Sequence, residues 1–150
     1  MKIILFVAFI LLIGYAFFSS QNSESSGTSQ APRENQIVSG SDSVLANAYK
    51  NHTSNIQVTG EGTITRLLSD DNIGSRHQRF IIEVGSGQTL LVAHNIDIAP
   101  RIGSLSTGDS IQFCGEYEWN EKGGVIHWTH RTASGSHAPG WLKHNGTVYQ

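Results

Sequence analysis

Residues 110–119 read SIQFCGEYEW, and this stretch decides the fold class. Every second position is apolar or glycine, and the positions between are polar or small. A spacing of two predicts a β-strand with one buried face, because strand side chains alternate between the two sides of a sheet. The segment 120–124, NEKGG, then predicts a hairpin loop, and residues 125–130, VIHWTH, are expected to return as the next strand.

The same alternation continues upstream, in residues 56–65, 80–84 and 90–94. The first of these segments is long and contains Gly60 and Gly62, which indicates a strand that bends or bulges sharply. Five main strands result, with a loop or one short helix between the third and the fourth. This order predicts a mainly β protein, a small OB-like barrel of five to six strands.

Two short segments complete the predicted domain. Residues 41–50, SDSVLANAYK, place three apolar side chains on one helical face, so we expect one short N-terminal helix capped by Ser41 or Asp42. At the other end, Asn145-Gly146 is a strong signal for a hairpin turn. In the stretch just before this turn, Trp141 and Leu142 are expected to dock on the barrel, while Lys143 and His144 face water.

The beginning of the chain has the layout of an export signal. Residues 1–18, MKIILFVAFILLIGYAFF, combine one lysine with an apolar block, and small residues permit cleavage after Ala16. The alternative is an uncleaved membrane anchor. Residues 19–41 have the composition of a flexible polar linker, and residues 42–150 are expected to form a single domain. We therefore expect an exported protein, periplasmic or secreted, that contacts the inner membrane only through residues 3–18.

Bulk composition narrows the class of protein. The formal net charge is -2 and only 15% of residues are charged, so neither a basic polyanion binder nor an acidic tail protein is indicated. The single cysteine, Cys114, cannot form an internal disulfide and is expected to be a small buried side chain in a strand. No GxSxG, HExxH or P-loop motif is present, so the enzyme classes that carry these motifs are not supported.

Several quoted segments resemble known proteins. The stretch LSTGDSIQFCGEYEWNEKGGVIHW resembles strands four and five of bacterial OB-fold proteins. Together, GEGTITRLLSDD, RHQRFIIEV, LLVAHNIDIAPRI, GEYEWNEKGGVIHWTH and GWLKHNGTVYQ resemble a family of small exported bacterial proteins of uncharacterised function. This resemblance covers about residues 56–150. It implies a compartment and an OB-fold-like domain, and it supplies no activity.

Histidines are dense near the end of the chain, where residues 127–144 contain four of the seven. His127 and His130 lie three residues apart in a predicted strand, which puts them on opposite faces. We therefore do not expect them to bind one metal together unless the strand bulges at Thr129.

A second set of histidines follows the core faces of the strands. His94 and His130 are expected at one end of the core, where His137 could join them. Three converging imidazoles suit zinc or copper, and Asp97 or Asp109 could add a carboxylate. The alternative is that each histidine only forms hydrogen bonds at the rim of the barrel.

The segment SRHQRF offers a candidate general base. Arg76 and Arg79 flank His77, and two neighbouring cations would lower the pKa of its imidazole and keep it neutral. The arginines could then bind an anionic group such as phosphate. Alternatively, Asp70 and Asp71 pair with the arginines and the segment is a solvated loop.

These patterns favour an exported binding module. OB-like barrels bind oligonucleotides and oligosaccharides through aromatic and basic side chains. The expected ligand surface consists of Arg76, His77, Arg79, Trp128, Arg131 and Trp141. Candidate partners are nucleic acid, a cell-envelope glycan or another envelope protein, and the net negative charge disfavours tight nonspecific DNA binding.

Two other classes stay open. One is a metal- or histidine-dependent hydrolase, nuclease-like, with His77 and His127 as catalytic candidates and a divalent metal such as zinc as its cofactor. The other is a structural or inhibitor-like protein whose histidines only pack.

Overall fold

The computed structural model describes residues 39–132 and 134–150, all within one compact unit, Glu34–Gln150. The predictions for residues 1–18, and for the linker up to residue 38, lie outside the described residues. The elements are α1 (Ser39–Lys50), β1 (Ile56–Leu67), β2 (His77–Val84), β3 (Thr89–Asn95), β4 (Ser110–Glu118), β5 (Val125–His127), β6 (Trp141–His144) and β7 (Thr147–Tyr149). No helix in the described ranges is long and apolar enough to cross a membrane.

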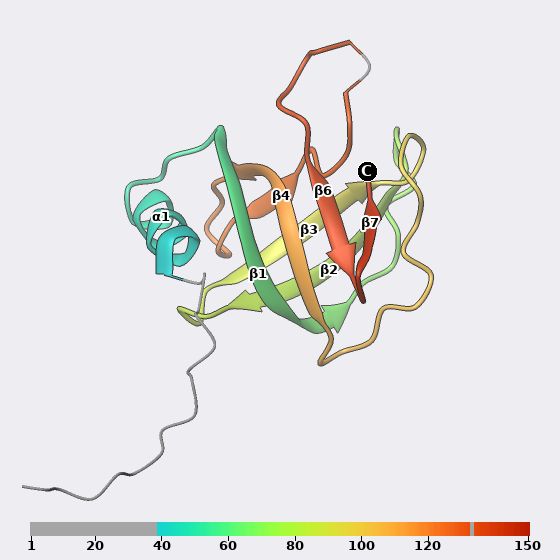
Figure 1. Cartoon of the computed structure of the whole chain (residues 1–150). Helices are drawn as coiled ribbons and strands as arrows, with labels where there is room; N and C mark the ends of the chain where they lie inside the picture. Colours follow the sequence, from blue (N-terminus) through green and yellow to red (C-terminus); the bar gives the residue numbers. More distant parts are fainter. Residues whose placement is uncertain (1–38, 133) are drawn as a thin grey trace, which may run out of the picture. The chain divides into compact units, whose positions relative to one another are not determined.

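Five of the strands form a closed barrel (Figure 1). The hydrogen-bonded order is β1-β2-β3-β5-β4, and β4 pairs back onto the first part of β1. β3 and β5 run parallel, whereas the other neighbours in the ring are antiparallel. The predicted fold class is confirmed: a mainly β protein built on a small barrel, with one short N-terminal helix.

β1 closes the ring because it is long enough to pair with both β4 and β2. Its two glycines allow close approach: a Cβ at Gly60 would lie 2.7 Å from the ring of Phe113, and a Cβ at Gly62 would lie 2.9 Å from a backbone oxygen of β2. The pairing register with β2 then shifts between Ile64 and Arg66, which is a β-bulge. The predicted bend is therefore present, and the bulge follows the glycines rather than coinciding with them.

Inward-facing side chains from all five strands fill the barrel. The hydrophobic ones with no exposed surface are Ile64, Phe80, Ile82, Leu90, Val92, Ile111, Phe113, Tyr117 and Ile126. Burying each such side chain contributes about 1.5–3 kcal/mol. α1 adds Leu45 and Ala48 to the same core. The helix begins at Ser39, before the predicted caps Ser41 and Asp42.

β5 is shorter than predicted, because it ends at His127 whereas residues 125–130 were expected to be one strand. Trp128 has a φ of 51°, in the left-handed region, which interrupts the pleat. β6 then pairs with residues 112–114 of β4, on the edge that β5 has left. One edge of β4 cannot hold two neighbours at the same position, so β5 must leave before β6 begins. The alternation of side chains between the two faces of the sheet therefore does not extend from His127 to His130.

The β6–β7 hairpin turns at Asn145 and Gly146, which both have positive φ, as predicted. The prediction that His144 faces water is wrong. Because this segment is a strand, Leu142 and His144 share its buried face and Lys143 is exposed. The His144 Nε2 atom lies 2.8 Å from a carboxylate oxygen of Asp109, which gives the buried imidazole a partner.

Gly140 lies where the chain crosses between β5 and β6. A Cβ on Gly140 would overlap the carbonyl oxygen of Trp128 and lie 2.5 Å from that of Cys114. We predict that Gly140→Ala lowers the free energy of unfolding by about 1–3 kcal/mol, because neither backbone oxygen can move freely. Urea denaturation measures this change. Gly103→Ala is the control, since nothing lies within 4 Å of the added Cβ. Equal unfolding midpoints for the two variants would contradict a tight crossing.

Candidate functional site

Four aromatic rings gather where the chain leaves β5: His127, Trp128, His130 and His137. The Trp128 ring stacks on that of His137, with centroids 4.2 Å apart and planes 19° from parallel. It also meets the His130 ring at 5.7 Å and the His127 ring at 5.3 Å. The rings of His130 and His137 contact each other edge to face at 4.9 Å. We call these four residues the ring cluster. Trp128, His130 and His137 belong to the segment between β5 and β6, which projects from the barrel at the top of Figure 1, and His127 is the last residue of β5.

Trp128 holds a backbone conformation that a bulky residue rarely adopts. A positive φ costs a residue with a side chain about 1–2 kcal/mol. The surrounding contacts maintain it: the next residue, Thr129, has no exposed surface, and the Gly140 amide donates a 2.9 Å hydrogen bond to the carbonyl oxygen of His130. Strained residues of this kind concentrate at functional sites.

The two loop histidines, His130 and His137, each bond through Nδ1 to the carbonyl oxygen of the next residue. Nδ1 of His130 lies 2.8 Å from the carbonyl oxygen of Arg131, and Nδ1 of His137 lies 2.8 Å from that of Ala138. A carbonyl oxygen only accepts, so each Nδ1 carries a proton and donates it to that oxygen. Burial is the largest cause that lowers the pKa of His130, which favours the neutral form of its ring.

His94 is a core residue rather than a free ligand. It has no exposed surface, its Nδ1 lies 2.8 Å from the hydroxyl of Thr129, and its Nε2 lies 3.1 Å from the carbonyl oxygen of Pro100. Burial lowers the pKa of His94 from 6.5 to about 4. With both nitrogens engaged by the protein, the imidazole stays neutral and braces the residue that follows Trp128.

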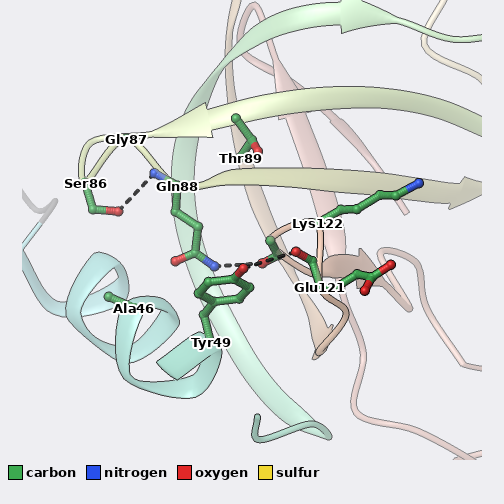
Figure 2. Close-up of a pocket in the computed structure, with 9 residues that line it drawn as sticks. Ala46, Tyr49, Ser86, Gly87, Gln88, Thr89, Glu121 and Lys122 are labelled. Atoms are coloured by element: carbon green, nitrogen blue, oxygen red, sulfur yellow. Dashed lines mark hydrogen bonds between the residues drawn. The ribbon is translucent and has the colours of Figure 1, made fainter. Parts of the chain in front are cut away.

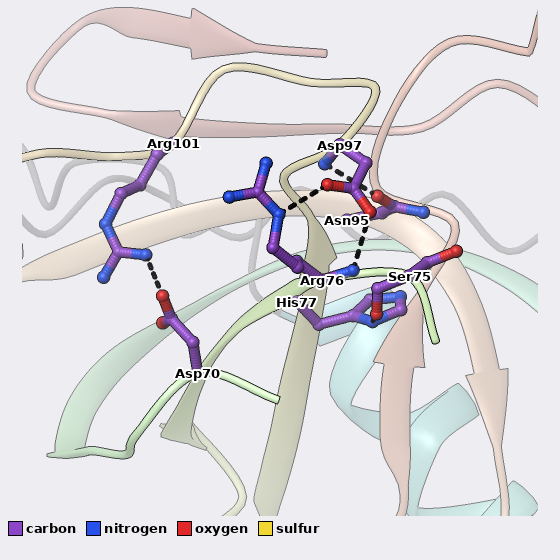
Figure 3. A network of polar contacts seen from close by, with 7 residues as sticks. All are labelled: Asp70, Ser75, Arg76, His77, Asn95, Asp97 and Arg101. Atoms are coloured by element: carbon purple, nitrogen blue, oxygen red, sulfur yellow. Dashed lines mark hydrogen bonds and ion pairs between the residues drawn. The ribbon is translucent and has the colours of Figure 1, made fainter. Parts of the chain in front are cut away.

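Arg76, one of the two arginines of the predicted anion site, is paired with a carboxylate, and so is Arg101 nearby (Figure 3). Arg76 makes two contacts with Asp97, from its backbone amide at 2.8 Å and from Nε at 2.7 Å. Arg101 pairs with Asp70. Arg79 donates from Nε to a backbone oxygen of its own loop at 3.1 Å. Of the alternative pairing, in which Asp70 and Asp71 hold Arg76 and Arg79, the structure has only a 4.0 Å contact between Arg79 and Asp71, because Arg76 pairs with Asp97 and Asp70 with Arg101.

His77 lies at the start of β2, and its Nδ1 is 2.8 Å from the carbonyl oxygen of Ser75. A charge on this ring lowers the pKa values of His94 and His130, after the larger effect of burial. In the β2–β3 register His77 is opposite Asn95, the neighbour of His94, so His77 and His94 lie at the same end of the barrel.

Arg131 and Trp141 lie on either side of the projecting segment. Arg131 is exposed, and its guanidinium lies 2.7 Å from the side-chain oxygen of Gln150 when that amide is oriented to accept. Trp141 is half-buried at the start of β6, where it pairs with Cys114 on β4. Cys114 is in a strand, as predicted, and is only half-buried because it alternates with the core residues.

His127 of the ring cluster also belongs to a second group, whose two carboxylates the sequence analysis did not single out. Glu116 and Glu118 on β4 and His127 on β5 each offer one ligand atom, and the three atoms lie within 4.8 Å of one another. Nε2 of His127 is 3.5 Å from a Glu116 oxygen and 3.9 Å from a Glu118 oxygen. Both distances exceed the usual N–H···O range of about 2.7–3.2 Å.

The His127 Nε2 atom is also buried, and it has no hydrogen-bond partner among the described residues. Leaving a buried polar atom unpaired costs about 1–3 kcal/mol. Burial lowers the pKa of His127, and the charges of Glu116 and Glu118 oppose this shift without reversing it. The predicted ligands His94, His130 and His137 do not form a comparable group: within the described ranges, only Glu116, Glu118 and His127 do.

A hollow of about 550 Å³ lies between α1, the β2–β3 turn and the β4–β5 loop (Figure 2). The Tyr49 hydroxyl donates to the carbonyl oxygen of Glu121 at 3.1 Å, and Gln88 donates to that of Gly123 at 2.8 Å. These bonds tie the three elements together. None of the predicted site residues lines this hollow.

Fold and geometry define a class: a small closed β-barrel whose β5–β6 segment carries a cluster of aromatic rings beside two carboxylates. The chain belongs to the family described as "Protein of unknown function (DUF3465)", whose sequence profile matches residues 31–150. This confirms the resemblance to a family of uncharacterised function, and it extends that resemblance upstream of residue 56. No curated protein and no solved structure matches the chain.

The neutral state of His94 leads to a prediction on stability and pH. Between pH 6.5 and 4 the unfolded chain binds a proton at this histidine and the folded protein does not, so stability falls as the pH is lowered through this window. A full shift of this size corresponds to about 3 kcal/mol. Urea denaturation at several pH values should show that the free energy of unfolding depends less on pH in His94→Gln than in the unmodified chain. His52→Gln, at an exposed histidine, is the control. If the free energy of unfolding of His94→Gln changes with pH as much as that of the unmodified chain, His94 is not the source of the pH dependence.

Proposed function

We propose that this protein is an exported binding module and that the ring cluster binds a cell-envelope glycan. The observation that carries the proposal is Trp128, a half-buried indole in a strained conformation that three imidazoles surround. Aromatic rings give flat apolar contact area, and neighbouring polar side chains fix the orientation of a ligand. Sugars have both an apolar ring face and hydroxyl groups that can bond to imidazole and carboxylate atoms.

Charge distribution favours a glycan over a nucleic acid. Binding to a phosphate backbone requires free cations, because neutralising phosphates supplies most of the affinity. In this protein Arg76 and Arg101 are paired with aspartates. The surface beside Trp128 also carries the carboxylates of Glu116 and Glu118, which would repel phosphates. An uncharged ligand meets neither obstacle.

The predicted location supports the same class of ligand. Residues 1–18 have the layout of an export signal, which would place the barrel among envelope polymers rather than cytosolic nucleic acids. The projecting β5–β6 segment suits this role, since ligand-binding residues concentrate on loops that a rigid scaffold positions.

Binding can be tested with a soluble N-acetylglucosamine oligosaccharide and with oligothymidylate. We expect calorimetry to detect the oligosaccharide, with affinity reduced about tenfold or more by Trp128→Ala, a loss of about 1.4 kcal/mol. Trp119→Ala is the matched control, because that indole packs against His52 and bonds to the backbone of α1. Preference for oligothymidylate would overturn the glycan assignment. Cleavage of the oligosaccharide, lost in His77→Ala or His127→Ala, would instead support the hydrolase alternative.

Export has a separate test. In a bacterial host, we expect the chain to leave the cytoplasm, with its mass reduced by cleavage after Ala16 or with its N-terminus retained in the inner membrane. Cell fractionation and intact mass measurement distinguish these two forms. A variant without residues 3–18 is the control and should stay in the cytoplasm. Cytoplasmic accumulation of the soluble, uncleaved full chain would contradict export.

A further inference from the structure

We propose that Glu116, Glu118 and His127 form a binding site for a divalent transition-metal ion, with Zn²⁺ as the best fit. The site lies on the outer surface of the barrel, across the β4–β5 pair. It differs from the histidine triplet expected from the sequence, and it goes beyond glycan binding without depending on it.

Strand pairing explains why these three side chains meet. Glu116 and Glu118 are two residues apart on β4, so they point to the same face, and their neighbours Gly115 and Tyr117 are buried. In the antiparallel register, His127 of β5 is directly opposite Glu116. Opposite side chains on one face are about 4.5–5.5 Å apart at Cβ, and diagonal neighbours remain within reach of long side chains. Two backbone strands therefore preset the arrangement.

The position of one atom points to a bound cation. Nε2 of His127 is buried, has no hydrogen-bond partner among the described residues, and faces carboxylate oxygens at 3.5 and 3.9 Å. These distances are too long for good hydrogen bonds and too short for a water molecule to fit between the atoms. A metal ion can bridge all three groups directly, because it attracts the lone pair of the nitrogen and both carboxylates at once.

The donor set selects the kind of ion. One imidazole nitrogen and two carboxylate oxygens match the ligands of Zn²⁺, at about 2.0–2.2 Å each, with a fourth position left for water. A nitrogen ligand argues against Mg²⁺ and Ca²⁺, which prefer oxygen. The two carboxylates would also balance the double positive charge of the ion. The ligand atoms are now up to 4.8 Å apart, and rotation of the flexible Glu side chains brings them closer.

Metal binding would also affect the ring cluster. The His127 ring lies 5.3 Å from that of Trp128, so an ion that fixes His127 restricts the neighbouring indole. Trp128 fluorescence is therefore expected to report occupancy even when no glycan is present.

The experiment titrates the metal-stripped full chain with ZnCl₂ by calorimetry and by competition with a chromogenic chelator. We expect one equivalent of Zn²⁺ to bind and the thermal unfolding midpoint to rise with zinc concentration. His127→Ala, Glu116→Gln and Glu118→Gln should each weaken binding about 100-fold or more, since even residues that only support a ligand change affinity about 10–100-fold. The Gln variants keep the size of the side chain, and circular dichroism verifies that each variant is folded.

Two matched controls decide where the metal binds. Glu83→Gln alters an exposed carboxylate on β2, and His137→Ala alters a histidine of the ring cluster that is outside the proposed site. Both should bind Zn²⁺ as the unmodified chain does. Loss of binding in His137→Ala, or unchanged binding in the two Gln variants of the site, would overturn the assignment. Failure of the unmodified chain to bind zinc at micromolar concentration would overturn it as well.

Discussion

The site exists because two strands, β5 and β6, must pair with the same edge of β4. The other edge of this strand is paired with β1, so β5 and β6 must share what remains. β5 occupies the part near residues 116–118 and β6 the part near residues 112–114. Because a backbone position can bond to only one neighbour on each side, the chain has to leave the sheet between the two strands.

The backbone is crowded at the point where β6 replaces β5 as the neighbour of β4, and glycines make this close packing possible. A Cβ at Gly115 would lie 2.5 Å from the carbonyl oxygen of His127, and a Cβ at Gly140 would overlap that of Trp128. The backbone contacts that require glycine at these two positions also hold Trp128 at positive φ. The strained indole is therefore a consequence of how the barrel closes, and the ring cluster is built on a rigid base.

Charge on this surface is arranged by the same strands. Two ion pairs join the loop before β2 to the loop after β3, whereas His127 is the only basic side chain in an ion-pair contact with Glu116 or Glu118 among the described residues. With Arg76 and Arg101 paired with aspartates, and with Glu116 and Glu118 beside Trp128, this surface attracts a polyanion weakly and suits a neutral ligand or a metal ion. The proposed glycan site and the proposed zinc site thus occupy neighbouring parts of one surface.

The amino-acid sequence by itself determined the first four strands, the start of the fifth, the barrel class and the final hairpin turn, because alternation and the Asn145-Gly146 turn are local signals. It also pointed to His127, Trp128, His130 and His137 through their density. Only the tertiary structure decided that Glu116 faces His127, that His94 is buried with both nitrogens bonded, and that Trp128 ends its strand. These features depend on the pairing register of the strands and on the competition of β5 and β6 for one edge of β4. Register and competition both involve residues that are far apart in the chain, so they cannot be predicted from any short segment of the sequence.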